Sequence, residues 1–151
     1  MNLTKLEEQL ALEEGSPPKT YLDTKGILTG GIGHNLIDEP EAGFDRVGVI
    51  VPPEVCTRWF QKDIQDAIKD LDYHLRWWDS LNDVRQNALL NLCFNMGING
   101  LLTFKNTLKM LEIGDYRGAA NGLRNSQYAK DVGRTRSGRL AAMIETGEWQ
   151  L

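Results

Sequence analysis

Apolar residues at helical spacing mark the first element that the sequence predicts. Leu3, Leu6 and Leu10 recur at intervals of three and four residues, which places them on one face of a helix covering residues 3–14. Gly15 and the two prolines that follow it closely end this helix.

A short polar segment between two β-prone stretches predicts a hairpin. The turn signal D-T-K-G at residues 23–26 stands between Tyr21 and the β-prone residues 27–29. Residues 35–53 are rich in glycine and proline and predict a surface excursion, with a short strand at 47–51 and no catalytic role.

The rest of the chain has the spacing of helices. A long amphipathic helix over about residues 54–76 carries apolar residues at intervals of three or four: Cys56, Phe60, Ile64, Ile68, Leu71 and Leu75. The densest apolar stretch predicts a buried core helix at 83–96, broken by Gly97 and Gly100. Shorter helices are expected at 104–111, 116–123 and 138–146, with a polar loop at 125–136.

One early hairpin region followed by helices indicates the α+β class. At 151 residues, with 41% hydrophobic and 25% charged residues, the chain is typical of one soluble domain. We expect a single domain in two lobes: a β lobe at about 15–53 and a helical lobe at about 77–151, joined by the long helix.

Charge and hydropathy argue against two classes of partner, nucleic acids and membranes. A net charge of -4 argues against a nucleic-acid binder, because such proteins usually carry a basic excess. No apolar run approaches the roughly 18 residues of a membrane span, so no membrane insertion is expected. The N-terminus is a charged amphipathic segment without a signal-peptide core, and we expect synthesis in a cytoplasm.

The cysteines and histidines do not indicate a metal site or a cofactor. Cys56 and Cys93 lie in apolar patterns without CxxC spacing, which predicts two buried thiols rather than a disulfide. His34 and His74 are the two histidines of the chain, too few for a zinc hydrolase of the usual kind.

Two carboxyl groups in different settings suggest glycoside hydrolysis, which usually needs a protonated carboxylic acid and an ionised partner. Glu14 closes the first helix and Asp23 lies at the hairpin turn. Periodicity does not choose between Glu13 and Glu14, because each lies roughly 50° from the centre of the apolar stripe. Thr29 follows on the predicted strand and could hold a water beside the carboxylate, although threonine is also a common strand former.

The order of several motifs resembles the bacteriophage lysozyme (endolysin) family. Residues 14–15 read E-G and residues 21–34 read Y-L-D-T-K-G-I-L-T-G-G-I-G-H, like the catalytic region of that family. The resemblance continues with W-D-S-L-N-D-V-R-Q-N-A-L-L-N-L-C-F-N-M-G at 78–97, F-K-N-T-L-K-M-L at 104–111 and T-G-E-W at 146–149.

The resemblance implies a lysozyme-like fold and a set of site residues. The family's catalytic glutamate, aspartate and threonine correspond to Glu14, Asp23 and Thr29. Its cleft-lining positions correspond to Phe94, Asn95 and Asn106. Its histidine–aspartate pair, which ties the hairpin lobe to the long helix, corresponds to His34 and Asp63.

The activity that the resemblance implies is hydrolysis of the β-1,4 bond between N-acetylmuramic acid and N-acetylglucosamine in bacterial peptidoglycan, without metal or cofactor, in host cell lysis. The alternatives are a lytic transglycosylase, which cleaves the same bond without water, and a non-catalytic peptidoglycan-binding module. A monomer is expected, made in the host cytoplasm and reaching the periplasmic wall through a holin-type partner.

Overall fold

The computed structural model describes residues 1–150 and confirms the α+β class, with helices predominating over one small antiparallel sheet. The chain divides into two compact units, which are described separately here: residues 5–66, and residues 1–4 together with 67–150. No helix of the described chain is long and apolar enough to span a membrane.

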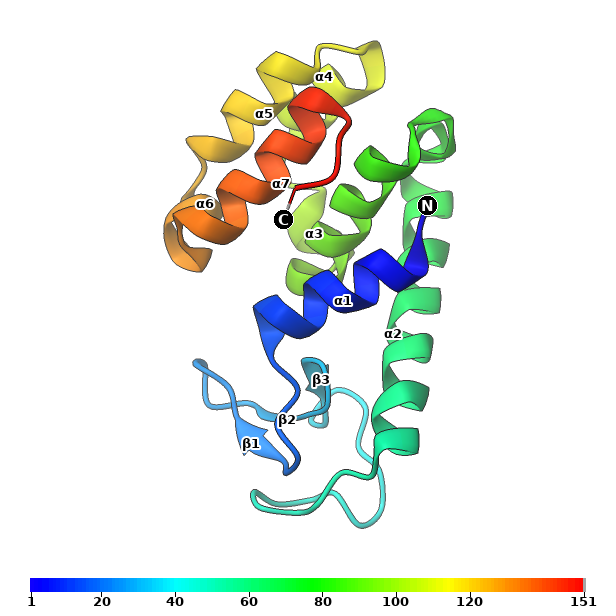
Figure 1. Ribbon diagram of the computed structural model, residues 1–151, viewed down its shortest axis with the longest axis vertical. Coiled ribbons are helices and arrows are strands. Elements are labelled where there is room, and N and C mark those ends of the chain that lie inside the picture. The colour runs from blue at the N-terminus through cyan, green and yellow to red at the C-terminus, as the bar shows by residue number, and fades with distance from the viewer. Residues whose placement is uncertain (151) are drawn as a thin grey trace. The chain divides into compact units, whose positions relative to one another are not determined.

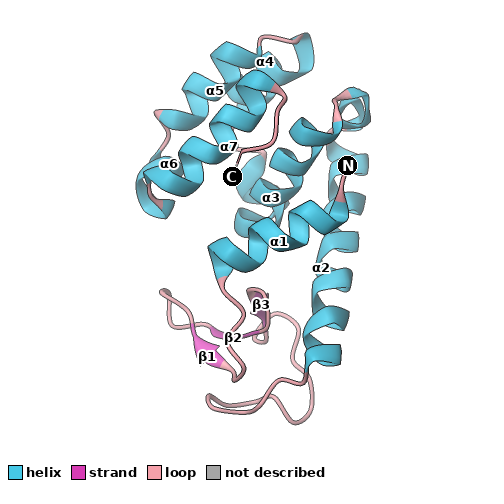
Figure 2. Ribbon diagram, viewed as in Figure 1, coloured by secondary structure: helices cyan, strands magenta, loops and turns pink. Residues whose placement is uncertain are grey.

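The unit of residues 5–66 holds the sheet (Figures 1 and 2). Its helices are α1 (Leu3–Glu14), most of which lies in this unit, and the first part of α2 (Pro53–His74). The strands are β1 (Tyr21–Leu22), β2 (Leu28–Gly30) and β3 (His34–Asn35), in the order β1-β2-β3. The predicted hairpin is confirmed, and Tyr21 pairs with Thr29 across it.

The predicted strand at 47–51 is wrong, because the segment forms a single bridge between Lys19 and Ile50. The backbone of this segment forms hydrogen bonds with Thr20 instead. The N–H of Thr20 donates to Val49 O at 2.8 Å, and the Thr20 hydroxyl accepts from Val49 N at 2.9 Å. Pro18, which accepts from the N–H of Val51, has no N–H of its own to donate. A regular ladder therefore cannot extend in that direction.

A small apolar cluster supports the sheet. Leu28, Leu36, Val51 and Trp59 are buried together. An alanine Cβ at Gly30 would lie 2.7 Å from Cζ3 of the Trp59 ring. The glycine therefore allows the sheet to approach α2 closely at this point.

The unit of residues 67–150 is helical. After the 3₁₀ helix Arg76–Ser80, it contains α3 (Asp83–Leu101), α4 (Lys105–Ile113), α5 (Tyr116–Arg124), α6 (Gln127–Val132) and α7 (Arg134–Thr146). Helix α7 packs against α3, α5 and α6, and its close packing along α5 is visible in Figure 1. The most apolar stretch of the sequence is the buried part of α3, as predicted.

Two predictions about this unit need correction. Helix α3 is kinked at Gly97, which has φ 76°, but it continues through Gly100 to Leu101. The expected polar loop at 125–136 contains α6 and the start of α7. Ser126 caps α6 by accepting a hydrogen bond from Ala129 N, and burial of Ala129 holds the short helix against its neighbours.

Candidate active site

Glu14 is the last residue of α1 and lies beside the turn that joins β2 to β3. The N–H of Gly15 donates to Ala11 O at 2.9 Å and closes the helix. A Cβ at Gly33 would lie only 3.3 Å from Oε2 of Glu14, so the carboxyl group and this glycine are close neighbours. Glu13 accepts instead from Gln9 Nε2, at 3.0 Å along the helix.

Asp23 is fixed by the hairpin turn. Its Oδ1 accepts hydrogen bonds from the backbone N–H groups of Lys25 at 2.8 Å and Ile27 at 2.9 Å. Its own N–H donates to Ile27 O at 2.9 Å, which continues the pairing of the hairpin. Two backbone donors suit an ionised carboxylate and hold its orientation.

Thr29 is buried in the centre of the sheet, with 4% of its surface exposed. Its hydroxyl donates to Ile27 O at 2.8 Å. The hydroxyl proton is therefore engaged within the strand, and the oxygen keeps lone pairs that can accept a hydrogen bond.

Tyr21 also lies at the candidate site, although the sequence pattern did not identify it. The tyrosine is half-buried on β1 and pairs with Thr29 in the sheet. Burial raises the pKa of Tyr21, and the charges of Glu14 and Asp23 raise it further. The pairing of Tyr21 with Thr29 and its two-residue spacing from Asp23 are the signals that could have identified it.

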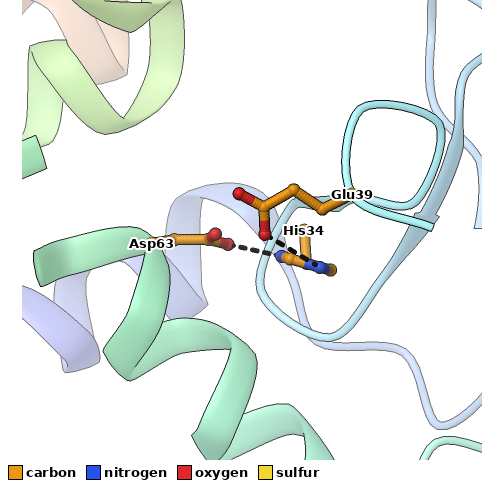
Figure 3. Close-up of side chains that lie close together, drawn as sticks. All are labelled: His34, Glu39 and Asp63. Carbon is orange, nitrogen blue, oxygen red and sulfur yellow. Dashed lines mark hydrogen bonds and ion pairs between the residues drawn. The ribbon is translucent and has the colours of Figure 1, made fainter. Parts of the chain in front are cut away.

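His34 and Asp63 form the predicted contact, with Nδ1 and Oδ2 2.7 Å apart (Figure 3). The histidine side chain is 3% exposed, and its ring stacks on Trp59 with centroids 4.7 Å apart. On the other side of the ring, Nε2 lies 3.9 Å from Oε2 of Glu39, whose Oε1 is paired with Lys62. This cluster joins β3 and the following loop to α2.

The same cluster contains the ligand types of a metal site. His34, Glu39 and Asp63 each place one ligand atom within 4.8 Å of the others. However, the two ring nitrogens face different carboxylates, whereas a metal ion would need both carboxylates around one nitrogen. The geometry is that of a hydrogen-bond and ion-pair cluster.

Comparison with known proteins identifies the family of this chain. The phage lysozyme family model matches residues 11–141, which include the helix end, the hairpin and most of the helical unit. This chain belongs to the phage lysozyme family. The resemblance inferred from the sequence motifs is therefore confirmed, and the chain is a lysozyme-like peptidoglycan hydrolase.

Relatives of this phage lysozyme family member come from different sources. "Probable T4-type lysozyme 1" of Dictyostelium discoideum is 29% identical over 164 aligned residues, covering 96% of each chain. The "Endolysin" of Salmonella phage P22 is 30% identical over 116 residues, covering 75% of this chain and 74% of its own. The "Pre-baseplate central spike protein Gp5" of Enterobacteria phage T4 is 28% identical and is matched over 28% of its length.

The structure divides the predicted site residues of this lysozyme-like chain between the two units. Glu14, Asp23 and Thr29 all belong to the unit of residues 5–66. Phe94, Asn95 and Asn106 belong to the helical unit. Phe94 and Asn95 are half-buried on α3 shortly before its kink at Gly97, whereas Asn106 is exposed in the first turn of α4. Their contact with substrate stays a prediction.

Both cysteines of this lysozyme-like chain are free thiols, as expected. Cys93 is buried in α3, and its burial raises the pKa of the thiol to about 12. The expectation of burial is wrong for Cys56, which is half-exposed near the start of α2. Its Sγ lies 3.5 Å from Oγ of Ser16, a residue that is itself exposed.

Proposed function

We propose that this chain is an endolysin-type muramidase that hydrolyses the β-1,4 bond between N-acetylmuramic acid and N-acetylglucosamine of bacterial peptidoglycan, in host cell lysis. The observation that carries the proposal is a pair of carboxyl groups in contrasting settings. The charges of both groups raise the pKa of Tyr21. Glu14 ends a helix beside a glycine turn, while Asp23 is bound by two backbone donors. The endolysin name of the phage P22 relative supports the role in lysis.

In the proposed reaction, Glu14 donates its proton to the glycosidic oxygen as the bond to the sugar carbon breaks. The ionised Asp23 takes a proton from the attacking water as the water oxygen bonds to the sugar carbon, and its negative charge stabilises the positive charge that develops on the sugar. Thr29 accepts a second hydrogen bond from that water, because its own proton is already donated to Ile27 O. No step requires a metal or a cofactor.

The variant Glu14→Gln tests the proton donor, with Glu13→Gln as a matched control one residue away. The amide keeps the shape of the side chain but cannot donate the proton, so we expect the rate of peptidoglycan hydrolysis to fall by about 10²- to 10⁴-fold. Glu13 pairs back along the helix to Gln9, and its amide variant should keep nearly the full rate. The assay is release of soluble fragments from purified cell walls. Equal rates for the two variants would remove Glu14 from the mechanism.

Analysis of the products separates hydrolysis from its alternatives. A hydrolase leaves new reducing N-acetylmuramic acid ends, whereas a lytic transglycosylase leaves 1,6-anhydro ends that mass spectrometry distinguishes by the missing water. A non-catalytic binding module would leave the glycan intact while still sedimenting with cell walls. The anomer first formed, observed by proton NMR, distinguishes inversion from retention at the sugar carbon.

The cellular part of the proposal concerns access to the wall. We propose a monomer made in the host cytoplasm that reaches the periplasmic peptidoglycan when a holin-type partner permeabilises the inner membrane. Expression in a bacterial host with and without such a partner tests this route, and rapid lysis without any partner would contradict it.

A further inference from the structure

The segment of residues 48–51 lies antiparallel to the residues that lead into β1. The N–H of Thr20 donates to Val49 O at 2.8 Å, and Lys19 and Ile50 are the directly bridged pair between the two segments. Directly opposite residues of an antiparallel pair place their side chains on the same face. The side chains of Lys19 and Ile50 therefore lie together.

Burial shows which face of the sheet this pair occupies. Leu28 and Val51 are buried in one cluster with Trp59 of α2, so their side chains lie on the face that is turned to α2. Successive side chains along an extended strand point to opposite faces. Ile50 precedes Val51 and Thr29 follows Leu28. Ile50 and Thr29 are therefore both on the other face of the sheet.

The strand of Lys19 continues this face to the candidate active site. Lys19 lies two residues before Tyr21, and Tyr21 pairs with Thr29. At a rise of about 3.4 Å per residue, the Lys19–Ile50 pair lies about 7 Å along the strand from the Tyr21–Thr29 pair. The pair therefore extends the face that carries Thr29, which binds the attacking water in the proposed reaction.

Lys19 and Ile50 present one cation and one apolar side chain to solvent. Lys19 is exposed and takes part in none of the ion pairs formed among residues 1–150. Ile50 is 67% exposed, and Val47 in the preceding turn is 54% exposed. The chain has a net charge of -4, so its attraction to an anionic polymer depends on local cations of this kind. A ligand that holds a carboxylate next to small alkyl groups complements the pair.

The peptide stem of peptidoglycan has this chemistry, because it is a short peptide on N-acetylmuramic acid with alanine methyl groups and free carboxylates. We propose that Lys19 and Ile50 form a binding site for the peptide stem. The ammonium group of Lys19 binds a stem carboxylate, and the side chain of Ile50 covers the alanine methyl groups. This inference rests on the proposed function, because the stem reaches this end of the face when the glycan is bound at Thr29.

Thr20 is the positioning residue of this stem site. Its side chain is buried, and its hydroxyl accepts from Val49 N at 2.9 Å and donates to Arg46 O at 2.7 Å. These two hydrogen bonds hold the segment against the strand and keep Ile50 beside Lys19. Loss of the hydroxyl therefore loosens the stem site while both contact residues remain in the chain.

The first test compares glycan strands that keep their stem carboxylates with the same strands after these carboxylates are converted to amides. The readout is the ratio of kcat/KM on the two substrates. We expect Lys19→Met to lower this ratio about two- to fivefold, the range of an exposed ion pair. Lys69→Met is the control, because Lys69 is an exposed lysine of the other unit and its loss changes the net charge equally. A ratio in Lys19→Met equal to that of the control would overturn the proposal.

The same ratio tests the positioning role of Thr20. Thr20→Val keeps the shape of the side chain and should lower the ratio, whereas Thr20→Ser keeps the hydroxyl and should restore the wild-type ratio. A purely structural effect would slow the hydrolysis of both substrates equally and leave the ratio unchanged. An unchanged ratio in Thr20→Val would therefore refute the positioning role.

The second test concerns Ile50 and needs no activity. Methyl groups of ¹³C-labelled isoleucine are followed by NMR while the wild type is titrated with the disaccharide that the proposed reaction releases, with and without its stem. The Ile50 methyl signals should shift with the stem-bearing disaccharide and about threefold less with the bare one. Ile37 is the control, because it is 63% exposed and lies beyond β3, and its signals should not move. Ile50 signals that stay in place would overturn the proposal. If the wild type hydrolyses no glycan, the proposed function fails, but this titration still decides whether Ile50 contacts the stem.

Discussion

The close approach of Gly30 to Trp59 predicts a destabilising substitution whose size follows from the structure. In Gly30→Ala the new methyl group would lie 2.7 Å from Cζ3 and 3.3 Å from Cη2 of the indole ring. The ring cannot move away freely, because it stacks on His34 and makes an edge contact with Phe44, with ring centroids 5.0 Å apart. Its Nε1 also donates a hydrogen bond to Glu41 at 3.1 Å. Overpacking of this kind costs about 1–3 kcal/mol.

The assay is thermal and urea unfolding, with Gly138→Ala as the matched control. Gly30→Ala should lower Tm by about 2–12 °C in a chain of this size. A Cβ at Gly138, inside α7, would meet no atom within 4 Å, so the control should instead gain about 0.5–1 kcal/mol of stability.

A double-mutant cycle shows whether Trp59 is the cause. Trp59→Phe removes the ring atoms that the new methyl group would meet, although it is itself destabilising because it loses packing and the bond to Glu41. Gly30→Ala should therefore cost about 1 kcal/mol less in the Trp59→Phe background than in the wild type. Strictly additive effects, or a Gly30→Ala variant as stable as the wild type, would refute the steric argument.

Three further predictions concern buried or paired groups. Asp63→Asn weakens the contact to the nearly buried His34 and should cost about 1–3 kcal/mol in urea unfolding at pH 5, so an unchanged stability there would contradict the structural role of the pair. The hydrogen bond from Arg58 lowers the pKa of Glu41 from 4.5 to about 2, so the carboxylate stabilises the fold above pH 4.5 and loses this effect as pH falls toward 2. The stability difference between the wild type and Glu41→Gln should shrink over that range, and a constant difference would argue against the ion pair. Because burial raises the pKa of Cys93 to about 12, iodoacetamide at pH 8 should label the half-exposed cysteine of α2 first, whereas equal labelling rates by mass spectrometry would contradict its burial.

The helices were the most predictable part of the fold, because helical spacing of apolar residues is a local property. The predicted helix at 3–14 has the bounds of α1, and α2 begins and ends within two residues of the predicted 54–76. By contrast, α6 carries few apolar residues, and its stability comes from the cap at Ser126 and from burial of Ala129 against other helices. Burial of this kind depends on the tertiary structure, so the sequence pattern suggested a loop.

The glycine run of residues 30–33 shows a similar limit. In the structure, Gly30 and Gly31 face Trp59 and Cys56 of α2, and only Gly33 faces the candidate site through Glu14. A glycine indicates that space is needed, but the groups that fill the space here are 19 to 29 residues away in the sequence.

The two carboxyl groups of the candidate site differ in how far local sequence determines their positions. Asp23 is held by backbone donors two and four residues ahead, so the turn signal D-T-K-G was enough to place it. Glu14 depends on a contact with Gly33, whose φ of 64° is adopted readily only by glycine, and helical periodicity could not distinguish it from Glu13. A substitution within the hairpin turn should therefore disturb Asp23 first, whereas one at Gly33 should displace the proposed proton donor. The position of the proposed acid is thus set by tertiary structure and that of its partner by the hairpin itself.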